Sequence, residues 1–175
     1  GWNDAGDAAS NTVRLLQDEL DVFPLAELDS ENYYDHALVR PTAAFDDEGK
    51  RIIIWPTTVF YAPLAPQGSE LEGDNSNLGE DADIVVTGAN ADNIYLLLGS
   101  EPSRNWQNFA AEIIDMALAA DISGVVLLGA LLADAPHTRP ISIFASSENE
   151  QVRAELDVEK SSYEGPVGIL SVLAD

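Results

Sequence analysis

The chain has 175 residues, of which 46% are hydrophobic, and this is enough for one domain with a sizeable core. Its 31 acidic and 8 basic residues give a formal net charge of −23, which argues against binding to a phosphate backbone. Cysteine is absent, which excludes disulfides, thiolate metal sites and cysteine nucleophiles. Without an apolar run that could span a bilayer or a visible signal peptide, a cytoplasmic protein without membrane partners is predicted. The acidity fits either a high-salt cytoplasm or ordinary solubilisation.

The first part of the chain carries clear helix and strand signals. Apolar residues at helical spacing behind a polar start predict a helix over residues 4–20, with Asn3 or Asp4 as its N-cap. Residues 22–28 are a strand candidate, which Pro24 makes irregular or confines to a sheet edge. Three more strands follow, the first two joined as a hairpin: 38–45, 51–55 and 59–64.

Residues 66–83 form an acidic insertion. They hold six acidic residues and three glycines but no aromatic residue. Such a segment buries too little apolar surface to fold by itself, so a flexible surface loop is predicted. Residues 84–87 are expected to pair at a sheet edge after it.

The second part of the chain predicts a parallel strand pair. Residues 94–98 indicate a buried strand, a helix capped by Ser103 carries Trp106 on its inner face, and the apolar run 125–128 indicates the next buried strand. This order implies a right-handed βαβ crossover. The remaining elements are a strand at 141–145, a helix at 148–156 capped by Ser147, and a strand at 168–173. The alternation predicts an α/β fold with a mixed central sheet.

Both ends of the sequence suggest a piece of a longer chain. Gly1 opens a motif that normally follows a strand, and the apolar run 168–173 has nothing behind it. We therefore expect residues 1–175 to be a single domain that lacks its first strand and its C-terminal helices.

Polar loops after three of the expected strands hold the candidate functional residues. If the strand implied before Gly1 and the strands at 94–98 and 125–128 are parallel, their following loops share one sheet edge. That edge would gather carboxylates, an imidazole and two guanidinium groups, which suit acid–base chemistry or the binding of an anion. The catalytic candidates are His137, Asp134 and Glu101, and the ligand-binding candidates are Asn3, Asp4, Arg104 and Arg139.

These candidates also have a simpler interpretation. His137 and Arg139 could merely shape the proline-flanked loop 134–140, although His137 is the candidate that titrates nearest neutral pH. Asp134 and His137 could supply two metal ligands, but a third is missing, so no metal site is predicted. His36 is expected to be a surface or packing residue. Nucleotide-binding and hydrolase motifs are absent, and no cofactor is predicted.

Several segments together resemble a known family. They are GWNDAGDAAS at 1–10, WPT at 55–57 followed by Phe60-Tyr61, LLGSEPSRNW at 97–106, LGALLADAPHTRP at 128–140 and YEGP at 163–166. In these motifs the chain resembles the proteasome assembly chaperone 2 family, and most closely its bacterial branch, whose members are often labelled ATP-grasp-like. The resemblance implies a three-layer, phosphorylase/hydrolase-like sandwich. ATP-grasp chemistry relies on lysines, and the two in this chain, Lys50 and Lys160, are far from the candidate loops in sequence.

Two classes of function follow. In the first, the protein is a non-catalytic interaction or assembly factor and a homo-oligomer, with a trimer as one form, whose strand edges and helix faces contact itself or other proteins. In the second, it binds or converts a nucleoside-like or amide-like molecule in the crevice at the sheet's C-terminal edge, as a hydrolase, phosphorylase or ligase would. We favour the first class and expect no enzyme activity.

Overall fold

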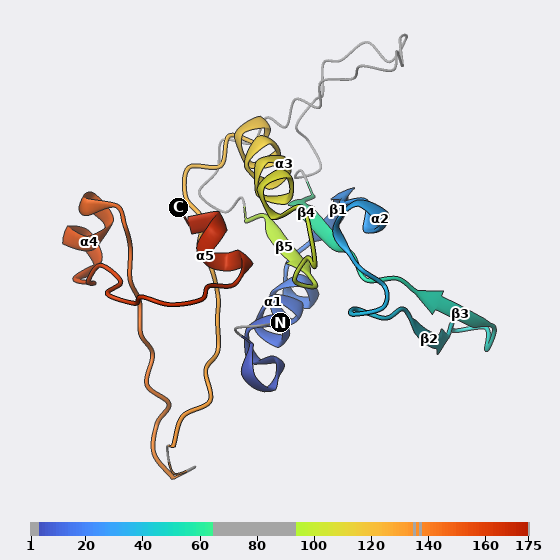
Figure 1. Ribbon diagram of the computed structural model, residues 1–175, viewed down its shortest axis with the longest axis horizontal. Coiled ribbons are helices and arrows are strands. Elements are labelled where there is room, and N and C mark those ends of the chain that lie inside the picture. The colour runs from blue at the N-terminus through green and yellow to red at the C-terminus, as the bar shows by residue number, and fades with distance from the viewer. Residues whose placement is uncertain (1–3, 65–93, 135, 137, 175) are drawn as a thin grey trace.

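The protein is mixed α/β, and the computed structural model describes residues 4–64, 94–134, 136 and 138–174 (Figure 1). Its centre is an antiparallel sheet in the order β1-β4-β5, made of β1 (Val22–Glu27), β4 (Thr58–Pro63) and β5 (Leu96–Gly99). All three strands lie within two residues of their predicted bounds. The register of β1 against β4 shifts between Pro24 and Ala26, which confirms the irregularity expected from the proline. The predicted acidic insertion and the strand at 84–87 lie outside the described residues.

The predicted parallel βαβ unit is wrong. β5 pairs antiparallel with β4, and residues 125–128 are not a strand, with Val126 83% exposed. In place of a ladder, this region makes a single parallel bridge between Asp4 and Ala130, in which the Ala5 amide donates to the Ala130 carbonyl at 3.0 Å. A continuous apolar run can form a buried strand only where a neighbouring strand accepts and donates hydrogen bonds to its backbone. The described ladders are therefore antiparallel and not mixed.

The longer helices are confirmed, although the residue at the N-cap position differs from the prediction in each, and for α1 it is Asp7 in place of Asn3 or Asp4. α1 (Ala8–Glu19) follows a 3-10 turn, η1 (Ala5–Asp7), and α3 (Trp106–Ala119) and α4 (Glu150–Leu156) lie where they were predicted. Asn105, at φ 56°, precedes α3 in place of Ser103. Asn149 caps α4 in place of Ser147, because its side chain accepts hydrogen bonds from the amides of Gln151 and Val152.

The last predicted strands are also wrong. Residues 141–145 run without regular structure and are exposed, while the apolar run expected as a strand at 168–173 forms α5 (Ile169–Ala174). Ile169, Val172 and Leu173 recur at the three- and four-residue spacing of a helix face and pack into the core beside α3. The pattern of this short apolar run fits both a strand and a helix, and tertiary packing selects the helix.

The core lies between α2 (Ser30–Tyr33), α3 and α5. Its buried members are Leu28, Tyr33, Tyr34, Phe109 and Ile169, and Trp106 packs against them as predicted. Tyr33 and Phe109 meet edge to face with ring centroids 5.2 Å apart. This arrangement places the end of β5 and the start of α3 against α2, where several candidate site residues lie.

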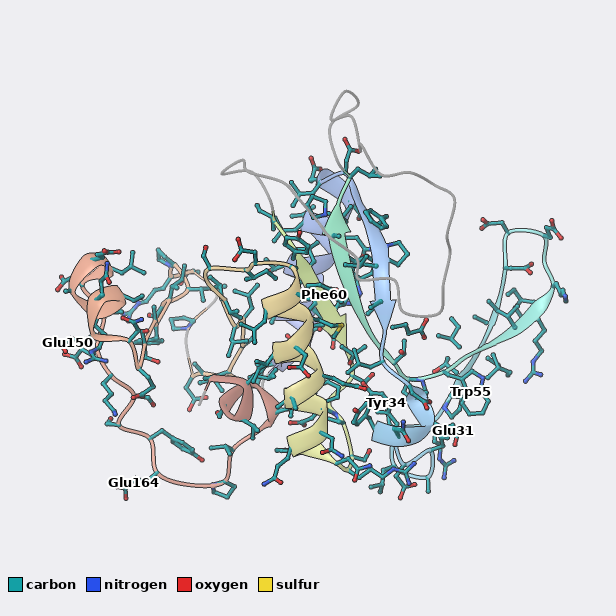
Figure 2. The ribbon with its side chains drawn as sticks, turned by 90° about the horizontal axis from the view of Figure 1, so that it is seen from above. Glu31, Tyr34, Trp55, Phe60, Glu150 and Glu164 are labelled. Carbon is teal, nitrogen blue, oxygen red and sulfur yellow. The ribbon has the colours of Figure 1, made fainter. Side chains whose placement is uncertain are left out.

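A separate two-stranded sheet projects from this body (Figure 1). β2 (Thr42–Phe45) and β3 (Arg51–Ile54) pair antiparallel and confirm the predicted hairpin. Asp46 builds the turn, because its side chain accepts hydrogen bonds from the amides of Glu48 and Lys50. Trp55, which is labelled in Figure 2, lies at the base of the hairpin. Its ring meets that of His36 edge to face, with ring centroids 4.9 Å apart.

Candidate functional site

Asp4 holds the start of α1. Its Oδ1 accepts a hydrogen bond from the Ala9 amide at 2.7 Å, and its Oδ2 accepts from the Ser10 amide at 3.0 Å and the Ser10 hydroxyl at 2.5 Å. Desolvation acts to raise the pKa of this carboxyl, but the hydrogen bonds from Ser10 and Ala9 outweigh it and lower the pKa below 3.8. The carboxylate is thus ionised and occupied by the helix end.

Glu101 and Arg104 likewise connect elements. The half-buried Glu101 follows β5, and its Oε1 accepts from the Ile169 amide at 2.9 Å, at the start of α5. Arg104 is exposed, and its guanidinium donates to the carbonyl of Glu31 in α2. Both side chains therefore satisfy backbone groups at helix ends, which would otherwise need water or another partner.

The segment from Ser103 to Asn105 satisfies the remaining carbonyls at the end of α2. The amides of Ser103 and Arg104 donate to the Tyr33 carbonyl at 2.9 and 3.3 Å, and Asn105 Nδ2 donates to the Asn32 carbonyl at 2.7 Å. Because the Ser103 amide is used in this way, Ser103 is drawn towards α2, and Asn105 takes the position before α3. The LLGSEPSRNW motif thus forms a structural junction between β5, α2 and α3.

Tyr34 is the centre of this junction. Its side chain is fully buried, and its hydroxyl lies 2.7 Å from Thr58 Oγ1 and donates to the Ser100 carbonyl at 2.8 Å (Figure 2). Burial raises the pKa of Tyr34, although the bond to Thr58 opposes the shift. The phenol is therefore a neutral structural donor that links α2 to both β4 and the end of β5.

The remaining candidates belong to the loop after residue 130. Asp134 and Arg139 are exposed, while Asn3 and His137 lie outside the described residues. The bridge to Ala130 brings the turn that holds Asp4 beside this segment. Within the described part of the chain, no hydrogen bond or ion pair joins any two of the candidate residues. The shared crevice stays a prediction.

A polar hollow of about 440 Å³ lies beside α2 and the first turns of α3, and its residues were not among the candidates. It is lined by Asn32, Tyr33, Asn105, Asn108, Ala111, Glu112 and Asp115. The Tyr33 hydroxyl donates to Glu112 at 2.6 Å, and desolvation and this carboxylate raise the pKa of Tyr33 to about 12. The phenol is a donor at neutral pH and does not act as a base there.

A sequence signal for this hollow exists. Asn105, Asn108, Glu112 and Asp115 follow each other at the three- and four-residue spacing of one helix face. Their oxygens can accept hydrogen bonds from a cationic group. Among the residues that the structure describes, no group of three or more histidines and carboxylates is placed to hold a metal ion. Nor is any described helix long and apolar enough to cross a membrane.

Comparison with known proteins decides the family. The sequence model described as the PAC2 family matches residues 1–175. This chain belongs to the PAC2 family. The resemblance drawn from its motifs is thereby confirmed. None of the curated proteins matches the chain significantly.

Several solved structures share the fold of this chain. A PAC2 family protein from Streptomyces avermitilis is 37% identical with a TM-score of 0.78, and the match covers 99% of this chain and 65% of that one. A proteasome-assembly chaperone homologue from Mycobacterium tuberculosis is 31% identical with a TM-score of 0.74, covering 99% and 64%. A protein of unknown function from Corynebacterium glutamicum, 20% identical with a TM-score of 0.71, covers 99% and 56% and shows the fold alone. The PAC2 chain thus spans less than two thirds of the length of these proteins.

Proposed function

We propose that this PAC2 family protein is a non-catalytic interaction factor that associates with itself and assists the assembly of other proteins. One observation carries the proposal. Apolar side chains between residues 131 and 144 stand in solvent, each more than four fifths exposed: Leu131, Leu132, Ile141, Ile143 and Phe144. Soluble proteins seldom expose apolar side chains so densely except where another surface covers them.

The candidate residues and the relatives support the same proposal. Asp4, Glu101 and Arg104 are engaged with backbone groups of helices, so their hydrogen-bonding capacity serves the fold. The relative from Mycobacterium tuberculosis is described as a proteasome-assembly chaperone homologue, and we extend an assembly role of this kind to the present chain. The net charge of −23 favours basic or neutral protein partners over nucleic acid or an anionic membrane, and a cytoplasmic location is part of the proposal.

The oligomeric mass tests this proposal. We expect the wild-type protein to exceed the mass of one chain in sedimentation equilibrium, and Ile143→Asp to lower that mass because it places a charge on the apolar segment. Leu118→Asp is the matched control, since Leu118 is exposed on α3, and this helix lies apart from the segment (Figure 1). A wild-type protein that is monomeric at every concentration, and that forms no complex with a basic or neutral partner, would contradict the proposal.

A second candidate function is the binding of a small molecule between the turn that holds Asp4 and the loop that follows Ala130. Its support is the parallel bridge between Asp4 and Ala130, which places two candidate loops side by side and differs from the antiparallel ladders elsewhere. This candidate function includes the proposal that the chain adopts a three-layer, phosphorylase/hydrolase-like sandwich. In the same set of measurements, a saturable rise in melting temperature with a nucleoside or an amide, lost in His137→Ala and Arg139→Ala, would favour it over the first.

A further inference from the structure

The β2–β3 hairpin has apolar side chains on both of its faces. Paired residues point to the same side, so Ile52 and Ile54 share one face, while Phe45 and Ile53 share the other. All four residues of β3 are exposed, and Phe45 is 72% exposed. A two-stranded hairpin alone is marginally stable in water, and an exposed apolar edge strand invites a further strand. A covering surface is therefore expected here.

Within the described residues, the outer edge of β3 presents backbone groups to which such a strand could hydrogen-bond. The Asp46 amide donates to the Lys50 carbonyl at 3.0 Å across the hairpin. Since backbone groups alternate between the two sides of a strand, those of Ile52 and Ile54 face β2, and those of Arg51 and Ile53 face outward. Among the described residues, no hydrogen bond to the outward groups of Arg51 or Ile53 is found. The outer edge of β2 is less suitable, because Pro41 beside it has no amide hydrogen.

The charge of the hairpin favours a second copy of this chain as the occupant. Two molecules of net charge −23 repel each other over most of their surfaces. Residues 38–55, however, hold three of the 31 acidic residues and three of the eight basic ones, so this segment is neutral. A second copy can approach this segment with little electrostatic repulsion.

We propose that two copies pair through β3, antiparallel about a two-fold axis at Ile53, to form a four-stranded sheet in the order β2-β3-β3-β2. The inference adds a contact, separate from residues 131–144, to the self-association in the proposed function, and it rests on that self-association. Both strands offer the outward groups of odd-numbered residues, so Ile53 faces Ile53 of the second copy as a hydrogen-bonded pair. The same register sets Ile52 opposite Ile54 of the second copy, and Arg51 opposite its Trp55. These are apolar and cation–π pairs between residues that are exposed in the single chain.

Cysteine crosslinking tests this register, because the chain has no cysteine of its own. A hydrogen-bonded antiparallel pair places its Cα atoms about 5.5 Å apart, within the range that a disulfide spans. Ile53→Cys should therefore give a covalent dimer under mild oxidation with diamide. Arg51→Cys is the matched control on the same strand. Its two thiols would lie four residues apart along the strands, with Cα atoms roughly 15 Å apart, and should not crosslink.

The outcomes separate this inference from the proposed function. Crosslinking of Ile53→Cys alone supports the register. Failure of Ile53→Cys to crosslink, or equal crosslinking of both variants, in a protein that sediments as an oligomer overturns the β3 contact and leaves self-association intact. A wild-type protein that sediments as a monomer removes both. Circular dichroism of each variant shows that it is folded. Ile53→Lys tests the contact without crosslinking, because it places two like charges at the two-fold axis and should abolish the contact.

Discussion

The Asp4 carboxylate accepts all three of its hydrogen bonds from the first turn of α1, so one side chain connects the N-terminal turn to a helix. The neighbouring backbone explains why this connection is needed. Gly6 and Asp7 have positive φ angles of 64° and 56°, which reverse the chain just before the helix. The residue directly before the helix therefore does not cap it, and the Asp4 carboxylate accepts from amides five and six residues later in its place.

Replacing this side chain should weaken the protein in a pH-dependent way. We expect Asp4→Ala to lower the free energy of unfolding by about 1 kcal/mol at pH 7. The folded-state pKa of Asp4 lies below 3.8, so its contribution is present above that pH and is lost as the pH falls through the folded value. Urea unfolding at pH 7 and at pH 3 measures this, and the difference between wild type and variant should shrink at pH 3.

The control for Asp4→Ala is Asp18→Ala. Asp18 is exposed near the end of α1, where a negative charge does not complement the helix dipole. Its removal should leave the stability unchanged or raise it slightly at pH 7. Equal losses from both substitutions, or a loss from Asp4→Ala that persists undiminished at pH 3, would contradict the role assigned to the Asp4 hydrogen bonds.

The junction of β4 and β5 depends on a residue without a side chain. Gly99 pairs with Thr58, and a Cβ at Gly99 would lie 2.1 Å from Thr58 Oγ1 and 2.5 Å from Thr58 Cα. The Thr58 hydroxyl in turn bonds to the buried hydroxyl of Tyr34. The glycine of the LLGSEPSRNW motif therefore allows the close approach through which the sheet meets α2.

Gly99→Ala should separate these elements. We expect the free energy of unfolding to fall by roughly 1–3 kcal/mol, since the clash involves backbone as well as side-chain atoms. Gly124→Ala is the matched control, because a Cβ there meets nothing within 4 Å. Chemical denaturation of the two variants measures the difference. Similar stabilities of Gly99→Ala and Gly124→Ala would show that β5 can shift at little cost.

Elements whose signals are local could be predicted from the sequence, and those that depend on distant partners could not. The hairpin was predictable because its turn residues and flanking strands are adjacent. The apolar run 125–128 carries a strand pattern, but a strand also needs a neighbour, and no pattern within the run supplies one. The run at 169–174 is a helix because its apolar face packs beside α3, and Glu101, 68 residues away in the sequence, accepts a hydrogen bond from its first amide.

The candidate site shows the same division. The sequence identified Asp4, Glu101 and Arg104 as notable polar residues, but it could not show that their acceptors and donors are backbone groups of α1, α5 and α2. It missed Tyr34, because a tyrosine in a polar connector gives no sign that its hydroxyl will lie between Thr58 and Ser100. The sequence shows which hydrogen bonds a side chain can make. The tertiary structure decides which distant group becomes its partner.

At the scale of the whole molecule, the acidic excess acts on every other interaction. A net charge of −23 repels itself when the chain is compact and destabilises the fold at low ionic strength. Among the described residues, two ion pairs are present, His36 with Glu31 when the imidazole is protonated and Lys160 with Glu148, so little of the charge is neutralised locally. The same repulsion opposes contact between two copies except where neutral segments meet, and the hairpin is one such segment.

Salt should therefore raise the melting temperature, and the shape of the rise distinguishes the two explanations of the acidity. Screening shortens the Debye length from about 10 Å at 0.1 M to about 3 Å at 1 M, so repulsion among surface charges is largely removed within that range. If the acidity only confers solubility, the melting temperature should level off below about 1 M sodium chloride. A fold adapted to a high-salt cytoplasm should continue to gain stability at molar concentrations. Thermal unfolding followed by circular dichroism measures this, and a melting temperature that does not rise with salt at all would contradict the self-repulsion.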